Sequence, residues 1–235
     1  MNEQTKIDQY HLPRIDDALD SLSGARYFST LDLASGYRQL RVSEEDIEKT
    51  AFSCHKELFE FVRMPFGLSI APATMHRALD ILLAHFKWEA CLVYLDDVIT
   101  FGAKFQMLRR LWMIFTLFRS ANLHLKQLKC YFGYAKVAYL GHLVSGNGVE
   151  VDPEKIRVVK EFPRPTTKTQ VRSFLGLACY YRRFIENFAK IALPLHKLMG
   201  EKRSLLGMKD VLAFEKLKTF LTEAPVLTMF DLMSV

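Results

Sequence analysis

Short alternating runs of apolar and polar residues over 25–62 predict several strands. The runs are RYFSTLDL, YRQLRV, TAFSC and LFEFVRM, and turn-like polar segments separate them. The Pro- and Gly-containing MPFGLSIAP is predicted to be a loop. It leads into ATMHRALDILLAHF, whose apolar residues recur at helical spacing. CLVYLDDVITFG contains two β-branched and aromatic runs on either side of Asp-Asp, which predicts a hairpin.

The second half of the chain changes from mixed structure to helix. Residues 104–121 predict an unusually apolar helix, and KVAYLGHLVS and GVEVD predict strands around a turn at 146–148. After residue 153, helices are predicted at PEKIRVVKEF, KTQVRSFLGLACYYRRFIENF and VLAFEKLKTFLTEA, and Pro163, Pro165 and Pro194 are expected to punctuate them. The pattern therefore predicts a mixed α/β body followed by a helical module.

Composition adds limits on size and location. With 235 residues, 50% of them hydrophobic, the chain can bury one core, or one core and a small appended unit. No apolar run of about 18 residues is present, and the N-terminus lacks the apolar segment of a secretory signal. We therefore expect an intracellular protein, cytoplasmic or nuclear, that does not contact a membrane.

The charge is unevenly divided along the chain. Residues 1–150 hold 17 Lys and Arg against 17 Asp and Glu, whereas residues 151–220 hold 15 against 7, a net of +8. A basic module attached to a neutral one suits contact with a phosphate backbone. A solvated helical surface would have the same charge, so charge alone does not decide between the two.

Three carboxylates carry the candidate chemistry. Asp32 lies at the end of an apolar strand, and Asp96 and Asp97 lie in the predicted hairpin turn. Such carboxylates at the rim of a sheet repel one another and need a compensating cation. Two Mg²⁺ ions about 3.5–4 Å apart would supply it and would align a 3′-hydroxyl with a nucleotide α-phosphate. The alternative is that Asp-Asp is simply favourable turn chemistry.

The surrounding motifs favour the metal site. LDLASGYRQL, RMPFGLSIAPATM, YLDD, NLHLKQLKC, YLGH, RPTTKTQVRSFLGLACYYRRFI and EAPVL occur in this order. Together they resemble the reverse transcriptases of gypsy-class LTR retrotransposons, from about Tyr10 to Asp231. The resemblance implies an α+β fold, namely a right-hand polymerase palm of antiparallel sheet and packed helices followed by a mostly helical thumb. It places truncated fingers and palm at 1–148, the thumb at 149–222 and the start of a connection to a missing RNase H domain at 223–235.

The resemblance also implies roles for residues near the carboxylates. Asp32, Asp96 and Asp97 match the metal-binding aspartates, which hold two Mg²⁺ ions (Mn²⁺ is possible), and Asp96 is the more direct ligand. Tyr37 matches the steric-gate aromatic that excludes a ribose 2′-hydroxyl, although it could be an ordinary strand aromatic. Lys129 matches the proposed proton donor to leaving pyrophosphate; by itself it would be interpreted as a surface residue.

Further positions match the family's contacts to substrate and nucleic acid. Phe66 and Gly67 match the loop against nucleotide and template, where Gly67 permits close backbone approach, although Pro-Phe-Gly could be a plain turn. Leu140 and Gly141 match the primer grip, which holds the primer mainly through its backbone; otherwise they are interpreted as strand and turn. The expected contacts to duplex phosphates are Lys168, Arg172, Arg182 and Arg183. Tyr180 and Tyr181 could pack against sugars, or belong to the core.

Several features depart from the family. A VDYRxLN-like fingers motif, whose basic residues hold the triphosphate, would precede the first residue here, so much of that grip is expected to be lost. The segment after YLDD is one residue shorter and more apolar than usual. One deletion rotates a helix by about 100°, which predicts exposed apolar surface or a partner contact. Because FDLMSV falls before the RNase H aspartates, we expect a fragment or degenerate copy of a longer polyprotein.

The sequence therefore predicts an RNA-directed DNA polymerase core. It would transfer nucleotides from dNTPs to a primer 3′-hydroxyl on an RNA or DNA template–primer. The alternatives are a catalytically weak or inactive retroelement remnant that binds nucleic acid or a protein partner, and a reading frame that does not fold stably. An RNA-dependent RNA polymerase is less favoured because Tyr37 stands at the steric-gate spacing, and hydrolysis by the same aspartates has little support.

Overall fold

The computed structural model describes residues 2, 5, 10–104, 107–200, 207–223, 227 and 229. They form two compact units: unit 1 from the described residues of Met1–Tyr139 and Met229–Val235, and unit 2 from those of Leu140–Thr228. Most of the predicted connection at 223–235 lies outside the described residues. No described helix has both the length and the apolarity that crossing a membrane requires.

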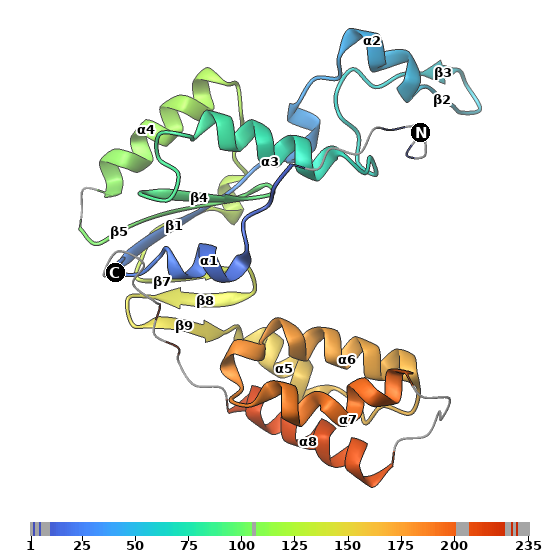
Figure 1. Ribbon diagram of the computed structural model, residues 1–235. Helices are drawn as coiled ribbons and strands as arrows, with labels where there is room; N and C mark the ends of the chain where they lie inside the picture. The colour runs from blue at the N-terminus through green and yellow to red at the C-terminus, as the bar shows by residue number, and fades with distance from the viewer. Residues whose placement is uncertain are drawn as a thin grey trace. The chain divides into compact units, whose positions relative to one another are not determined.

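An antiparallel sheet of four strands forms the centre of unit 1. Its order is β4 (Cys91–Tyr94), β5 (Asp97–Gly102), β1 (Tyr27–Asp32) and β6 (Tyr131–Tyr134) (Figure 1). The predicted hairpin is confirmed as β4 and β5, which are joined by the two-residue turn Leu95–Asp96. Strand β1 pairs with β5 along its whole length, so residues far apart in the sequence meet at the strand ends.

Helices α3 (Ala71–Leu82) and α4 (Met107–Ser120) cover one face of this sheet (Figure 1). The apolar residues that repeat every three or four positions in both helices point into one core with the sheet. This core is Leu31, Leu33, Met75, Leu79, Leu83, Cys91, Val93, Val98, Leu111, Ile114 and Phe118. Burying one such large side chain stabilises the fold by about 1.5–3 kcal/mol, so the two central strands whose ends carry the aspartates rest on a well-packed layer.

The predicted exposure of apolar surface after YLDD is confirmed on α4. Its opposite face leaves Leu108, Trp112 and Met113 exposed, Trp112 most of all at 68%.

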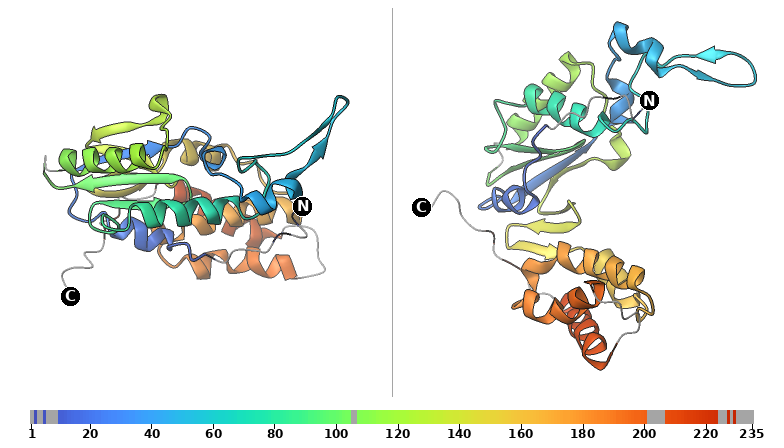
Figure 2. Two further views of the ribbon diagram at one scale, coloured as in Figure 1. Left: turned by 90° about the horizontal axis from the view of Figure 1, so that it is seen from above. Right: turned by 45° about the vertical axis from the view of Figure 1, so that its right-hand side comes forward.

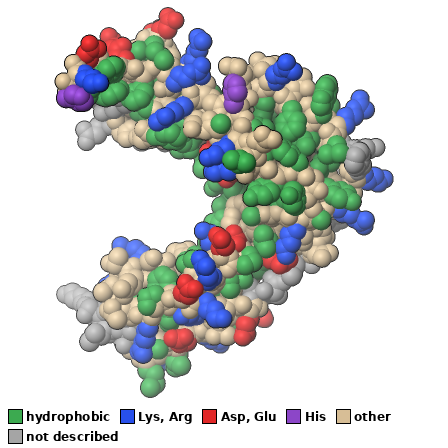
Figure 3. All heavy atoms as spheres, turned by 180° about the vertical axis from the view of Figure 1, so that it is seen from behind, with side chains coloured by type: hydrophobic (Ala, Val, Ile, Leu, Met, Phe, Trp, Pro, Cys, Tyr) green, Lys and Arg blue, Asp and Glu red, His purple; other side chains and the backbone are tan. Residues whose placement is uncertain are grey.

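The other elements of unit 1 are short. They are α1 (Ile15–Asp20), η1 (Gly36–Gln39), α2 (Glu44–Ile47), η2 (Glu48–Thr50), β2 (Phe52–Ser53), β3 (Leu58–Phe59), η3 (Gln127–Lys129) and β7 (Lys136–Tyr139). Strands β2 and β3 form a narrow ribbon that extends away from the rest of the unit (Figure 2). Phe52 stacks on Phe59 and Phe61 along this ribbon. In the part of unit 1 that carries α2, β2 and β3, charged and His side chains lie beside hydrophobic ones (Figure 3).

Unit 2 is a hairpin followed by helices. The elements are β8 (His142–Ser145), β9 (Gly148–Val151), α5 (Pro153–Glu161), α6 (Lys168–Tyr180), η4 (Arg182–Phe184), α7 (Phe188–Gly200) and α8 (Met208–Thr222). Asp152 caps α5, and Thr167 with Gln170 forms a capping box at the start of α6. Phe162, Phe174 and Phe214 meet in the helical core, where the rings of Phe174 and Phe214 lie 4.5 Å apart between centroids.

Two of the secondary-structure predictions are wrong and two hold only in part. The strand predicted over KVAYLGHLVS is divided into β7 and β8, and the helix predicted over KTQVRSFLGLACYYRRFIENF ends at Tyr180. YRQLRV is not a strand: the left-handed Ser35 (φ 52°) turns the chain into the 3-10 helix η1, and only an isolated bridge between Arg41 and Arg63 remains. Pro194 does not punctuate helices but lies inside α7. The helix continues through it because Ala192, Leu195 and Leu198 are buried, which offsets the one backbone hydrogen bond that proline removes.

Candidate active site

The sheet brings Asp32 and Asp97 together. Asp32 is the last residue of β1 and Asp97 the first of β5, and their Cα atoms are direct partners in the antiparallel register. Directly opposed residues have side chains on the same face of the sheet. Asp96 precedes Asp97 in the turn, where Leu95 adopts a left-handed backbone with φ 57°. All three predicted carboxylates therefore lie at one end of the β1–β5 pair.

The three aspartates act as one electrostatic group. The pKa of Asp97 is raised, first by desolvation and then by the negative charges of Asp96 and Asp32, while Lys129 opposes the shift. Among the described side chains, no set of three or more His, Cys, Asp or Glu already stands as a metal-ligand cluster. In charge and donor type the group fits a divalent cation, because carboxylate oxygens are the ligands that such hard ions prefer.

The segment around η3 holds Asp32 in place. Lys129 Nζ lies 3.1 Å from Asp32 Oδ2. The Asp32 backbone N–H donates to Cys130 Sγ at 3.4 Å, and its carbonyl accepts from the Lys126 N–H at 2.8 Å. The predicted Lys129 is thus at the site. Cys130 also supports Asp32, through the hydrogen bond to its thiol, and nothing in the sequence around Cys130 predicted this contact.

Tyr37 lies beside the same carboxylates. Its pKa is raised by burial and then by the charges of Asp96 and Asp97. Its ring meets that of Phe66 edge-on at 5.7 Å between centroids, and the Arg38 guanidinium lies 5.1 Å over Phe66. Gly67 has φ 92°, a conformation that suits glycine. The predicted Tyr37, Phe66 and Gly67 therefore lie in one neighbourhood with the aspartates.

Two supporting residues were not predicted. A Cβ on Gly36 would lie 3.4 Å from Leu33 Cβ and 3.7 Å from Asp96 Cβ, so glycine lets η1 pack closely on the carboxylate turn. Gln39 accepts from the His124 N–H at 2.6 Å and donates to the carbonyls of Ala34 and His124. The motif Gly-Tyr-Arg-Gln marked both positions, but only tertiary contacts show what they do.

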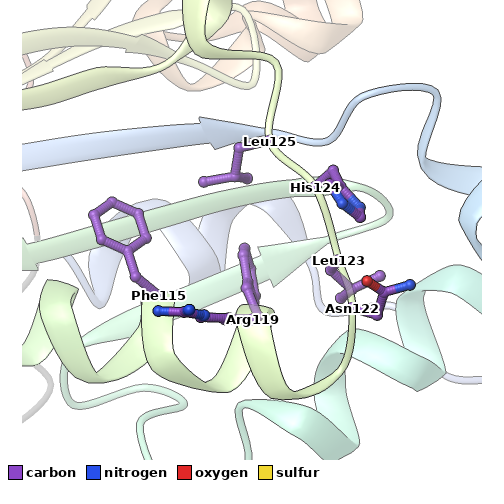
Figure 4. A pocket seen from close by; sticks show the side chains of 7 residues that line it. Phe115, Arg119, Asn122, Leu123, His124 and Leu125 are labelled. Atoms are coloured by element: carbon purple, nitrogen blue, oxygen red, sulfur yellow. The ribbon is translucent and has the colours of Figure 1, made fainter.

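A pocket of about 320 Å³ lies at the C-terminal end of α4. It is lined by Phe115, Phe118, Arg119, Asn122, Leu123, His124 and Leu125 (Figure 4). The segment around His124, which is hydrogen-bonded to Gln39, therefore forms one wall of the pocket. None of the predicted site residues lines the pocket.

In unit 2, Leu140 and Gly141 form a tight turn with two consecutive positive φ angles, 45° and 67°. Tyr180 Oη donates to the Leu140 carbonyl at 2.7 Å, and Tyr181 Oη donates to that of Gly141 at 2.9 Å. The two predicted primer-grip residues are therefore held by the tyrosine pair of α6, a link that the sequence did not reveal.

The predicted basic residues of unit 2 lie on α6 and η4. Lys168 and Arg172 are four residues apart, so with Gly176 and Tyr180 they follow one face of α6, and Arg172, Gly176 and Tyr180 are exposed. No atom lies within 4 Å of a Cβ placed on Gly176, so this face is open there. Arg182 and Arg183 follow in η4.

Residues 1–179 match the family described as reverse transcriptase (RNA-dependent DNA polymerase). The chain belongs to this family. It is 39% identical over 234 residues to the Retrovirus-related Pol polyprotein from transposon 297 of Drosophila melanogaster, covering 98% of this chain and 22% of that protein. It is 42% identical over 207 residues to the polyprotein from transposon gypsy of the same species, covering 87% and 20%. The predicted gypsy-class resemblance is confirmed, and the chain spans about a fifth of the length of these relatives.

Solved structures confirm the predicted fold. The foamy viral protease-reverse transcriptase dRH in complex with ds DNA superposes with a TM-score of 0.89 at 22% identity, over 97% of this chain and 41% of that one. The foamy viral protease-reverse transcriptase in complex with RNA/DNA hybrid gives 0.85, also at 22% identity, over 97% and 31%. The α+β polymerase fold of the reverse transcriptase family is therefore present, while the roles of individual site residues stay predictions.

Proposed function

We propose that this chain is the core of an RNA-directed DNA polymerase, a nucleotidyltransferase that extends a primer 3′-hydroxyl with dNTPs on an RNA or DNA template. The observation that carries the proposal is the direct pairing of Asp32 with Asp97, with Asp96 beside them in the turn. Family membership supports the reaction type. In this proposal residues 1–148 act as fingers and palm, and 149–222 as the thumb.

Asp32, Asp96 and Asp97 are proposed to hold two divalent ions, Mg²⁺ or Mn²⁺. When bound, such ions lower the cost of bringing an attacking 3′-oxygen to a nucleotide α-phosphate. The pKa of Asp97 is raised first by desolvation and then by the charges of Asp96 and Asp32, and this repulsion among the three carboxylates supports the assignment. Lys129, which pairs with Asp32, is proposed to supply a positive charge and a proton to the leaving pyrophosphate as that group develops negative charge.

Tyr37 is proposed to select the sugar. Its ring is held against Phe66 and next to the carboxylates, so a ribose 2′-hydroxyl would collide with it, whereas a deoxyribose would fit. Phe66 and Gly67 are proposed to pack on the incoming nucleotide and template.

Unit 2 is proposed to bind the template–primer duplex. The open face of α6 presents Lys168 and Arg172, and Arg182 and Arg183 follow it in the chain. Positively charged side chains along a helix face suit a phosphate backbone, and binding should weaken with salt. The foamy viral proteins of the same fold are described in complex with an RNA/DNA hybrid and with dsDNA, which supports a nucleic-acid partner.

Primer extension on poly(rA)/oligo(dT) with Mg²⁺ tests the proposal, with Asp96→Asn as the control. We expect extension by the unmodified chain and none by the variant. Duplex binding without Mg²⁺-dependent incorporation would instead favour a remnant that only binds nucleic acid. Undiminished extension by Asp96→Asn would remove the two-metal assignment.

A further inference from the structure

The Leu140–Gly141 turn is unusual because each of its two carbonyls accepts a hydrogen bond from a tyrosine. Tyr180 Oη donates to Leu140 O at 2.7 Å and Tyr181 Oη donates to Gly141 O at 2.9 Å. The two tyrosines are adjacent, Tyr180 being the last residue of α6 and Tyr181 its C-cap. Two neighbouring hydroxyls at the end of one helix therefore hold two successive peptide groups of one turn.

His142 adds a third constraint. Its Nδ1 lies 2.7 Å from Leu140 O. Because a carbonyl can only accept, the hydrogen must be on Nδ1, and together with Tyr180 it fills both lone pairs of that oxygen. The His142 ring also stacks on Tyr180 at 5.4 Å and on Phe184 at 5.8 Å between centroids. Rotation of the Leu140 carbonyl away from this cluster would break two hydrogen bonds at once.

Glycine at position 141 is required by the same arrangement. A Cβ there would lie 3.2 Å from Tyr181 Oη and 3.5 Å from Tyr180 Cε1, in a backbone with φ 67°. A side chain would therefore be strained by the backbone and would also crowd the Tyr181 hydroxyl, while its contact with the Tyr180 ring would be an ordinary one. The turn and the tyrosine pair fit each other only with glycine between them.

The hydrogen bonds also fix where the amide donor of the turn points. All described peptide bonds are trans, so the Gly141 N–H points away from the Leu140 carbonyl oxygen. With that oxygen held by Tyr180 and His142, the N–H, which lies in the same peptide plane, is fixed in the opposite direction. Gly141 is only partly buried, so a phosphate or sugar oxygen can approach it.

We propose that Tyr180 and Tyr181 are positioning residues that lock the Leu140–Gly141 turn, so that its backbone amide meets the sugar–phosphate backbone of the primer near its 3′ end. This inference rests on the proposed function, because the turn can hold a primer only if the chain binds one. The tyrosines act through the turn, and their hydroxyls do the positioning while their rings supply packing.

Replacing both tyrosines by Phe separates these two roles, since Tyr180→Phe/Tyr181→Phe removes only the hydroxyls. Tyr131→Phe is the matched control, because it removes an exposed phenol hydroxyl from β6 in unit 1. The full chain is used throughout. Three quantities are measured: affinity for a labelled RNA/DNA template–primer by anisotropy, single-turnover incorporation of one dNTP, and hydrogen exchange of the amides of residues 139–143 with and without duplex.

We expect the double variant to bind duplex within about twofold of the unmodified chain but to incorporate about tenfold or more slowly, since each hydrogen bond removed is worth about 2- to 12-fold. Duplex should slow exchange in residues 139–143 of the unmodified chain and of Tyr131→Phe, and do so less in the double variant. A purely structural role would lower thermal stability and leave this duplex-dependent protection unchanged.

The outcomes distinguish the positioning role from the proposed function. If the unmodified chain neither binds nor extends the duplex, the proposed function fails and this inference falls with it. If it extends the primer and the double variant extends equally well with equal protection of 139–143, only the positioning role is overturned. Slower incorporation with weaker protection supports it, and an equal decline in Tyr131→Phe would contradict it.

Discussion

Lys129 Nζ lies 3.1 Å from Asp32 Oδ2, so a cation of the protein itself already neutralises one of the three site carboxylates. Side-chain exposures of 57% and 29% limit what this pair adds to stability, which we place at about 1 kcal/mol or less. The pair matters more for function than for stability, because it holds the Lys129 ammonium group beside the site carboxylates.

Replacing Lys129 by Gln should therefore slow incorporation by about 100-fold, since one electrostatic donor to a transition state is commonly worth that much. The thermal midpoint should hardly move. Single-turnover incorporation is the measurement, and Lys126→Gln is the control, because Lys126 is exposed nearby and contacts Asp32 through its backbone. An equally slower incorporation rate in both variants would show that the positive charge of the segment matters and that the position of the Lys129 ammonium group does not.

A larger side chain at position 36 should displace the turn that carries Asp96, and the displacement should grow with the size of that side chain. Gly36→Ala places its Cβ at ordinary contact distances of 3.4 Å from Leu33 and Met75, so we expect a stability change of about 1 kcal/mol or less. Gly36→Val adds two methyl groups against the same neighbours and should push η1 away from Asp96. Urea unfolding and primer extension, compared for the two variants, check this. Full extension by Gly36→Val would contradict it.

Sugar selection should depend on the ring of Tyr37 and not on its hydroxyl. Tyr37→Val should raise incorporation of a ribonucleotide relative to the matching deoxynucleotide by about 10- to 200-fold, the range that one steric contact in a pocket supplies. Tyr37→Phe keeps the edge-on contact with Phe66 and should retain the original preference. The ratio of kcat/KM values for the two nucleotides is the measurement, and a similar shift in both variants would point to the hydroxyl instead.

The sequence predicted the strands and helices whose patterns are local and missed those set by tertiary contacts. The β4–β5 hairpin, α3, α4, α5 and α6 followed from periodicity, and the motifs named Asp32, Asp96, Asp97, Tyr37 and Lys129, which the fold brings together. Helix α7 was missed because Pro194 argues locally against a helix, and α1 and β6 because their runs are short.

The supporting contacts were beyond prediction for a different reason. Cys130 and Gln39 act through partners 98 and 85 residues away, and the link from Tyr180 to Leu140 spans 40. No local pattern encodes such pairings, so they became visible only in the folded chain.

Stability should fall in mild acid because of His76. This histidine is fully buried in α3, and burial lowers its pKa below 6.5, with Lys87 acting in the same direction and Asp80 opposing it. The unfolded chain therefore binds a proton that the folded chain resists, and stability declines as pH falls below about 6.5, by up to about 1.4 kcal/mol per pH unit.

Urea unfolding at pH 7.5 and 5.5 measures this decline. His76→Phe preserves an aromatic ring beside Tyr10 and should flatten the dependence, whereas His196→Phe, at an exposed site on α7, should not. An unchanged slope in His76→Phe would assign the effect to other groups.

The salt dependence of duplex binding should report the basic face of α6. Changing Lys168 and Arg172 together to Gln should reduce the slope of log affinity against log salt by about 0.9 for each phosphate that the variant no longer neutralises. Lys190→Gln, which removes an exposed positive charge from α7, serves as the control. Anisotropy titrations between low and moderate salt give the slopes. Identical slopes for the unmodified chain, the double variant and Lys190→Gln would show that the duplex does not bind at the basic face of α6.

The left-handed backbone of Leu95 strains the turn between β4 and β5, immediately before Asp96. A bulky residue with φ 57° costs about 1–2 kcal/mol relative to a residue that tolerates this conformation. Asn or Gly would relieve that cost and would also let the turn sample other shapes. Thermostability and a fixed direction for the adjoining carboxylates therefore conflict at this position, so a screen for heat resistance alone would favour replacements of Leu95 that leave Asp96 and Asp97 less firmly oriented.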